Sequence, residues 1–129
     1  VIDLDTVMPG LSAHDFGDTV RFGANDCRED EEDQSKVHFL PQLYRVCERG
    51  FLSQAGEVLT AREKEVLRWG AKLMTLECGM RFLTDYLQGD VYFKIARPDQ
   101  NLDRARTQFT LVQQMEACWD ELAPEESKL

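Results

Sequence analysis

The spacing of apolar residues along the chain predicts three helices. Between residues 37 and 55, apolar side chains recur at steps of three and four residues, which is the period of a half-buried helix. A longer helical pattern covers residues 60–88, and Thr60 and Glu63 form a capping-box pair at its start. The last helix is predicted over residues 102–122.

The longest of these helices changes character midway. Beyond Gly70, apolar residues occur on every side of it, which predicts a buried helix. We expect six side chains of this helix and the next to be largely buried: Leu73, Leu76, Met80, Phe109, Met115 and Trp119. The pattern therefore favours a mainly α fold in which the two long helices pack together.

The start of the chain follows a different pattern. Residues 1–7 form an apolar run that carries Asp3 and Asp5, which is typical of a β strand, and a Pro-Gly turn follows. A lone strand cannot satisfy its backbone hydrogen bonds, and no partner strand is found in the sequence. We therefore interpret residues 1–129 as a single domain that is the C-terminal piece of a longer protein.

Two further segments separate this strand from the long helices. Residues 12–23 fit either a short helix or an irregular turn. Residues 26–35, here called the acidic loop, contain five adjacent carboxylates and no apolar anchor. Because like charges repel one another, we expect this loop to be solvated and mobile. The donor spacing and turn glycine of a calcium loop are missing from it.

Composition and charge narrow the classes of function. The 129 residues include 15 basic and 24 acidic side chains, a net charge of −9. This surplus repels phosphate backbones and anionic lipids, so we expect no nucleic-acid or membrane partner. The four cysteines lie at least 20 residues apart and form no CxxC pair. That spacing argues against a zinc site and favours reduced thiols and a cytoplasmic location.

Two groups of charged residues are candidates for chemistry. Asp3 and Asp5 share one face of a regular strand, where they either hold a hard divalent cation or form a solvated strand end. Glu77, Arg81 and Asp85 follow one another at four-residue steps, so they share one face of the long helix. Because charges in a buried helix must be paired, this stripe is either a structural ion-pair network or the wall of a polar ligand pocket.

Five sequence runs together are a more specific sign of a protein family than any one of them alone: VIDLDTVMPG (1–10), HDFGDTVRFG (14–23), LECGMRFLTDYL (76–87), GDVYF (89–93) and NLDRARTQF (101–109). The chain resembles the C-terminal half of the aminoglycoside phosphotransferase-like (choline kinase-like) superfamily, in the branch of the N-acetylhexosamine anomeric kinases. This resemblance implies the C-terminal helical lobe of a protein-kinase-like fold with a short N-terminal β segment. Members have also been labelled mucin-desulfating sulfatases, but the Cys/Ser-x-Pro-x-Arg motif of sulfatases does not occur here.

The resemblance also implies roles for individual residues. Asp3 matches the acid that holds Mg²⁺ against the ATP phosphates, and Asp15 matches an acid that braces the catalytic loop. Asp5 and Thr6 match residues on the phosphate and sugar side of the cleft. Contacts to the hexosamine are implied for three residues: Glu77, Arg81 and Tyr92.

The function implied by the resemblance is phosphorylation of the anomeric hydroxyl of an N-acetylhexosamine, with ATP and Mg²⁺. The HxD catalytic loop and the nucleotide-binding lobe of such kinases are not found in this sequence, so we expect the chain alone to transfer nothing. Two alternatives stay open. One is a kinase for another small hydroxyl acceptor, such as an amino alcohol or an aminoglycoside. The other is a catalytically silent helical module that only binds a partner.

Overall fold

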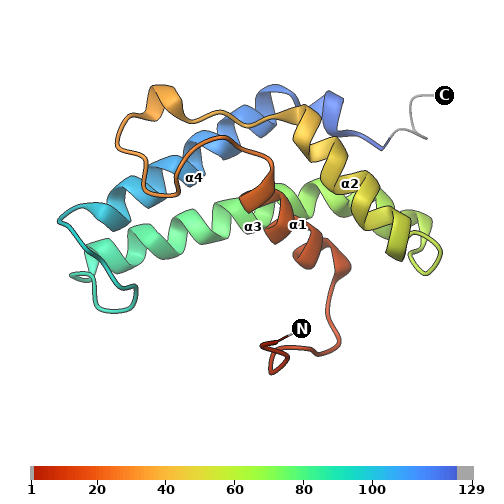
Figure 1. The fold of residues 1–129 in the computed structure, drawn as a ribbon, viewed down its shortest axis with the longest axis horizontal. Coiled ribbons are helices and arrows are strands. Elements are labelled where there is room, and N and C mark those ends of the chain that lie inside the picture. Colours follow the sequence, from red (N-terminus) through yellow and green to blue (C-terminus); the bar gives the residue numbers. More distant parts are fainter. Residues whose placement is uncertain (1, 125–129) are drawn as a thin grey trace.

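Four α-helices make up most of the protein in a computed structural model, which describes residues 2–124. The helices are α1 (Ser12–Gly23), α2 (Pro41–Ala55), α3 (Ala61–Leu87) and α4 (Gln100–Ala117), and short 3-10 helices cover Gln34–Lys36 and Trp119–Leu122. Figure 1 shows α3 and α4 side by side along the long axis, with α1 packed across α3, and α2 packs against α1. The prediction of a mainly α fold is confirmed.

The capping box predicted for the longest helix is present. The hydroxyl of Thr60 accepts a hydrogen bond from the backbone N–H of Glu63 at 3.2 Å, and the Glu63 carboxylate accepts one from the backbone N–H of Thr60 at 2.7 Å. These two bonds satisfy N–H groups that a helix start leaves without partners. The long helical pattern therefore begins where the sequence indicates.

Close backbone contact fixes the crossing of α1 and α3. A Cβ atom added at Gly17 of α1 would overlap the carbonyl oxygen of Gly70 in α3, and one added at Gly70 would overlap that of Ala13. Only glycine allows the two backbones to approach this closely. Beside this crossing, Phe16 and Tyr44 pack edge to face with ring centroids 5.6 Å apart, and both are fully buried. The hydrophobic core thus lies where α1, α2, α3 and α4 meet.

The prediction that α3 is buried on all sides beyond Gly70 is wrong. Leu73 and Met80 are 51% and 56% exposed. Leu76, Phe109 and Trp119 are partly buried, and of the six expected core residues only Met115 is fully buried. The physical reason is that α1 and α4 pack on one face of α3, whose buried residues from Gly70 onward are mostly small or polar: Gly70, Ala71, Thr75, Gly79, Phe82 and Asp85. Leu73 and Met80 lie on the part of the helix surface that stays exposed in the described residues.

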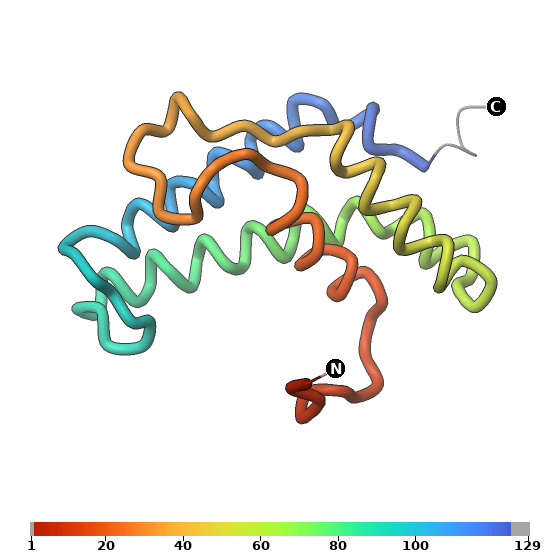
Figure 2. The backbone as a smooth tube through the Cα atoms, viewed as in Figure 1, coloured from red at the N-terminus to blue at the C-terminus, as the bar shows by residue number. Residues whose placement is uncertain are grey.

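The predicted N-terminal strand is not formed in the described residues. Residues 2–4 are irregular, and the backbone N–H of Val7 donates to the carbonyl oxygen of Leu4 at 3.2 Å across a turn. Asp3 has a φ of 63°, a left-handed conformation that a strand does not contain. No partner strand exists in residues 2–124, and the segment extends away from the helices (Figure 2), so nothing holds it extended. Val1, the first residue of the predicted strand, lies outside the described residues.

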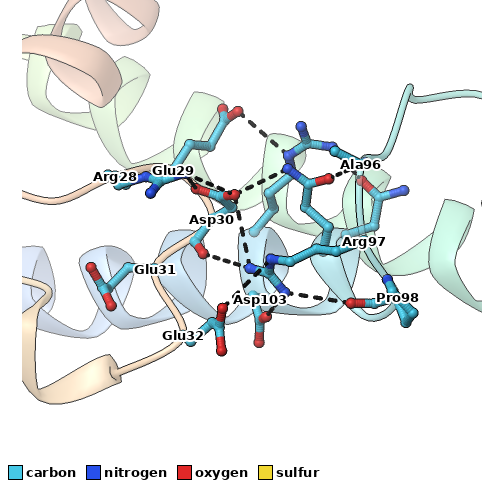
Figure 3. Close-up of polar contacts among 12 residues, drawn as sticks. Arg28, Glu29, Asp30, Glu31, Glu32, Ala96, Arg97, Pro98 and Asp103 are labelled. Carbon is cyan, nitrogen blue, oxygen red and sulfur yellow. Dashed lines mark hydrogen bonds and ion pairs between the residues drawn. The ribbon is translucent and has the colours of Figure 1, made fainter.

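The acidic loop is held by polar contacts, which contradicts the expectation of a mobile loop, although several of its side chains are exposed. Arg97 donates to the backbone carbonyl of Asp30 at 2.9 Å and to the Asp103 carboxylate at 2.7 Å. The Gln100 side-chain amide donates to the Asp30 carboxylate at 3.0 Å. Figure 3 shows these contacts between the loop, the segment before α4 and α4 itself. The loop has no apolar anchor, and Arg97 and Gln100, about 70 positions later in the chain, hold it by polar contacts instead.

None of the helices in the described part of the chain is long and apolar enough to cross a bilayer.

All four cysteines are free thiols, each partly buried. Burial raises the pKa of the Cys78 thiol above its ordinary value, which keeps this thiol protonated at neutral pH.

Candidate functional site

A groove lies at the C-terminal end of α3, where the chain turns back before α4. Its volume is about 540 Å³, within the range typical of small-molecule sites. Eight residues line it, six from α3 or its end and two from the loop that follows: Glu77, Met80, Arg81, Thr84, Asp85, Gln88, Tyr92 and Phe93. Residues more than ten positions apart therefore share one concave surface.

A sharp turn brings the loop back against α3. Gly89 and Asp90 both have positive φ, 94° and 58°, which reverses the chain just after the helix ends. The carboxylate of Asp85 then accepts three hydrogen bonds from the backbone N–H groups of residues 91–93, at 2.8 to 3.0 Å. One buried side chain thus fixes the path of the loop that carries Tyr92 into the groove.

Asn101 joins this arrangement to α4. Its side-chain amide donates to Asp85 at 2.8 Å and to the carboxylate of Asp90 at 2.9 Å, and Asn101 is fully buried. Burial by itself would raise the pKa of Asp85, but the amide groups of residues 91–93 and the Asn101 side chain outweigh it. Together they hold the pKa of Asp85 below its ordinary value. Asp85 is therefore a charged structural residue, and we call this set of contacts the Asp85 hub.

Arg81 lies at the centre of the groove wall. Its guanidinium carbon is 5.7 Å from the centre of the Tyr92 ring and 5.4 Å from that of Phe93. Its Nε atom is 3.7 Å from the carboxylate of Glu77. The Phe93 ring packs against Phe82 with centroids 4.7 Å apart, which anchors the aromatic side of the groove to the helix pair.

The charged stripe divides into two parts. Glu77 and Arg81 are paired with each other, with side chains 54% and 49% exposed, so the premise that they are buried is wrong. Asp85 is buried, but in the described residues it has no ion pair with Arg81 and bonds to backbone amides and Asn101. The stripe is thus neither one ion-pair network nor one uniform wall. All three residues line the groove, but Glu77 and Arg81 are half-exposed there, whereas Asp85 is buried and holds the loop.

The groove offers both polar and aromatic contacts. Glu77 provides carboxylate oxygens, Arg81 provides N–H donors, and Thr84 and Gln88 add a hydroxyl and an amide, all on exposed positions of α3 or its end. Tyr92 is 73% exposed and presents its ring to solvent. This combination suits a small polar molecule that has one apolar face.

Four predicted site residues lie outside the groove. Asp3, Asp5 and Thr6 are exposed in the irregular segment that precedes α1. Asp15 is exposed in the first turn of α1, where a carboxylate interacts favourably with the helix dipole. The structure does not bring these four residues to Glu77, Arg81 and Tyr92, and their implied roles stay predictions.

A magnesium site is not complete in the described residues. Residues 2–124 contain no group of three or more His, Cys, Asp or Glu side chains placed to hold a metal ion. Asp3 and Asp5 are exposed carboxylates two residues apart on a segment without regular structure. They do not by themselves form a coordination shell, and the magnesium role of Asp3 stays a prediction.

Sequence reasoning missed several residues of this region. Thr84 and Gln88 lie three and seven residues after Arg81, so helical spacing could have placed them beside it. Phe93 and Asn101 had no such signal, because their positions depend on the turn after α3. The Asn101 side chain bonds to Asp85 and Asp90, which are 16 and 11 positions earlier in the chain.

Comparison with known families adds no identification. No family model matches the sequence. Any function assigned to the groove therefore rests on its geometry and on the sequence runs that resemble the phosphotransferase-like superfamily.

Proposed function

We propose that this chain supplies the acceptor-binding groove of an ATP- and Mg²⁺-dependent phosphotransferase that phosphorylates the anomeric hydroxyl of an N-acetylhexosamine. One observation carries the proposal. Glu77, Arg81 and Tyr92, the three residues that the resemblance assigns to the acceptor, all line the same groove of about 540 Å³. Tyr92 reaches it only because the loop turns back after α3, which helical spacing does not predict.

The chemistry of the groove supports a polyhydroxylated acceptor. A sugar ring has an apolar face that stacks on an aromatic side chain, and Tyr92 offers such a ring beside Phe93. The hydroxyl groups of a sugar both donate and accept hydrogen bonds. This matches the Glu77 carboxylate, which accepts, and the Arg81 guanidinium, which donates and whose Nε lies 3.7 Å from that carboxylate. The Glu77 carboxylate is paired with Arg81, and the buried Asp85 carboxylate is bonded to backbone amides and Asn101. Because neither carboxylate is left without a partner for an ammonium group, the groove favours a neutral acceptor over an amino alcohol or an aminoglycoside.

Each residue then has a defined part in positioning the sugar. Glu77 accepts hydrogen bonds from ring hydroxyls, Arg81 donates to hydroxyl or acetamido oxygens, and Tyr92 stacks on the ring. Asp85 does not touch the acceptor and keeps Tyr92 in place through the backbone. The base that accepts the hydroxyl proton and the groups that bind ATP are expected in a longer protein, in which Asp3 would contribute to binding Mg²⁺.

The test is phosphoryl transfer by the longer protein that would contain this chain, with N-acetylglucosamine, choline and kanamycin as competing acceptors. We expect transfer to the sugar, a raised sugar KM for Arg81→Met and Tyr92→Ala, and an unchanged KM for ATP. Arg62→Met is the matched control, because Arg62 forms an exposed pair with Glu65 at the other end of α3. Transfer to choline or kanamycin alone would favour the other acceptors, and no transfer to any of the three would favour the silent binding module.

A further inference from the structure

A second, much smaller cavity lies between the end of α1, the start of the acidic loop and α4. Its volume is about 50 Å³, and Arg21, Cys27, Glu29, Thr107 and Gln108 are among the residues that line it. It is separate from the groove, with which it shares no lining residue. An inference about it does not depend on the proposed function.

Two of the residues that line this cavity carry a buried polar atom without a hydrogen-bond partner. Thr107 Oγ1 and Gln108 Oε1 are buried and form no hydrogen bond with any of the described residues. Thr107 and Gln108 are only 1% and 2% exposed, so bulk solvent does not reach them. Because an unsatisfied buried polar group costs free energy, two such groups on one cavity indicate a bound ligand that satisfies them.

The neighbouring charges restrict the kind of ligand. Glu29 accepts a hydrogen bond from Arg21 at 3.1 Å, and Arg104 Nε lies 3.8 Å from the same carboxylate. The two guanidinium groups would repel a cation, and the carboxylate and the two unpartnered oxygens would repel an anion. The electrostatics therefore favour a neutral ligand that can both donate and accept hydrogen bonds.

The size of the cavity restricts the ligand further. A water molecule needs a cavity of roughly 10–15 Å³ and two to four polar partners. The cavity has room for water but is far smaller than the roughly 300 Å³ at which small-molecule sites begin. The distance of 3.8 Å between Arg104 Nε, itself buried without a hydrogen-bond partner, and Glu29 also suits a bridging water better than a direct bond.

We propose that this cavity is a specific site for ordered water, which joins the acidic loop to α4. The water donates to Gln108 Oε1 and to the Glu29 carboxylate and accepts from the Thr107 hydroxyl. It thus completes a polar junction in which Glu29 is already bonded to Arg21 of α1. This water then adds to the contacts that hold the acidic loop, such as those of Arg97 and Gln100 with Asp30.

The test is the transfer of magnetisation from water to the protein in NMR spectra of the full chain. We expect cross-peaks between long-lived water and the side chains of Thr107 and Gln108 in the unchanged protein. Thr107→Val and Gln108→Met should weaken these cross-peaks and lower the Tm by a few degrees, because each removes a partner of the water. Thr107→Ser keeps the hydroxyl and should retain them.

Gln113→Met, at an exposed position of α4, is the matched control for the loss of a glutamine from this helix, and it should leave the cross-peaks unchanged. The absence of water cross-peaks at both side chains in the unchanged protein would overturn the proposal. A rise in Tm for both Thr107→Val and Gln108→Met would also overturn it, because removing an unsatisfied polar group from a dry cavity is stabilising.

Discussion

Glu77 and Asp85 lie on the same face of α3, eight residues apart, and the sequence presents them as equivalent carboxylates on either side of Arg81. In the structure they differ completely. The Glu77 side chain is 54% exposed in the groove, whereas Asp85 is 3% exposed and bonds to three backbone amides and Asn101. Spacing thus places residues on a face, but the chain that folds over that face decides which of them are available to a ligand.

The largest expected effect comes from Asp85→Asn. The new side chain keeps one acceptor oxygen, which can still serve residues 91 and 92, but its NH2 group faces the backbone N–H of Phe93 and the side-chain amide of Asn101, which lose their acceptor in a buried position. We expect the Tm to fall by roughly 10 °C. Thermal unfolding followed by circular dichroism measures this change.

Glu77→Gln is the control for this substitution, with the same change of chemistry on the same helix face. Because Glu77 is half-exposed and forms only a surface ion pair, we expect its Tm to change by no more than about 2 °C. Equal effects of the two substitutions would contradict the distinction between a structural and a ligand-facing carboxylate.

Acid should remove the contribution of Asp85 without any substitution. Its pKa is lowered in the folded protein, so the stabilisation is fully present above the unfolded pKa of about 3.9 and is lost as the pH falls through the lower folded value. We expect the free energy of unfolding to fall more steeply below about pH 4 in the unchanged protein than in Asp85→Asn. Urea unfolding at a series of pH values tests this, and parallel pH profiles would contradict it.

Asn101→Ala should have an intermediate effect. Asn101 is fully buried and donates to Asp85 and Asp90, but the backbone amides of residues 91–93 still satisfy Asp85 when it is removed. We expect the Tm to fall by roughly 5 °C and hydrogen exchange to become faster at residues 89–93. If exchange accelerated throughout α4 instead, Asn101 would be a core residue of that helix rather than part of the Asp85 hub.

A small effect on stability is likewise expected for Arg81→Met. Its ion pair with Glu77 is half-exposed, so its loss should change stability by no more than about 1 kcal/mol. Sugar binding should weaken all the same, because Arg81 lies at the centre of the groove wall. A large fall in Tm with unchanged sugar affinity would show that Arg81 is a structural residue. Arg62→Met is the control for the loss of a surface arginine from α3.

Local patterns in the sequence predicted the helices well. The capping box of Thr60 and Glu63, the long α3 and the helix that becomes α4 all depend on residues within a few positions of one another. The predicted segment 102–122 includes the 3-10 helix Trp119–Leu122, so only its earlier part is α-helix. Features of this kind depend on spacing and capping, which a single sequence contains.

Features that depend on distant residues could not be predicted in this way. The acidic loop is held by Arg97 and Gln100, about 70 positions later, and no local pattern indicates those contacts. The exposure of Leu73 and Met80 depends on which face of α3 packs against the other helices. Close contact is made at two glycines of that face, Gly70 against α1 and Gly79 against α4. Apolar content alone therefore overestimated the burial of α3.

The groove combines both kinds of information. Helical spacing placed Glu77 and Arg81 together, and the structure bears this out with a distance of 3.7 Å between them. The convergence of Tyr92 on the same surface depends on the turn at Gly89 and Asp90 and on the carboxylate of Asp85. The binding role of these residues stays a prediction until a ligand is tested.

The most direct test of the account is an NMR titration of the 129-residue chain with N-acetylglucosamine. The account predicts amide shifts confined to the end of α3 and residues 91–93, which weaken in Arg81→Met and persist in Arg62→Met. Kanamycin and choline should produce weaker shifts, because neither Glu77 nor Asp85 is left without a partner for an ammonium group. Shifts scattered away from the groove, or equal titrations for Arg81→Met and the unchanged chain, would contradict the claim that this groove binds the acceptor.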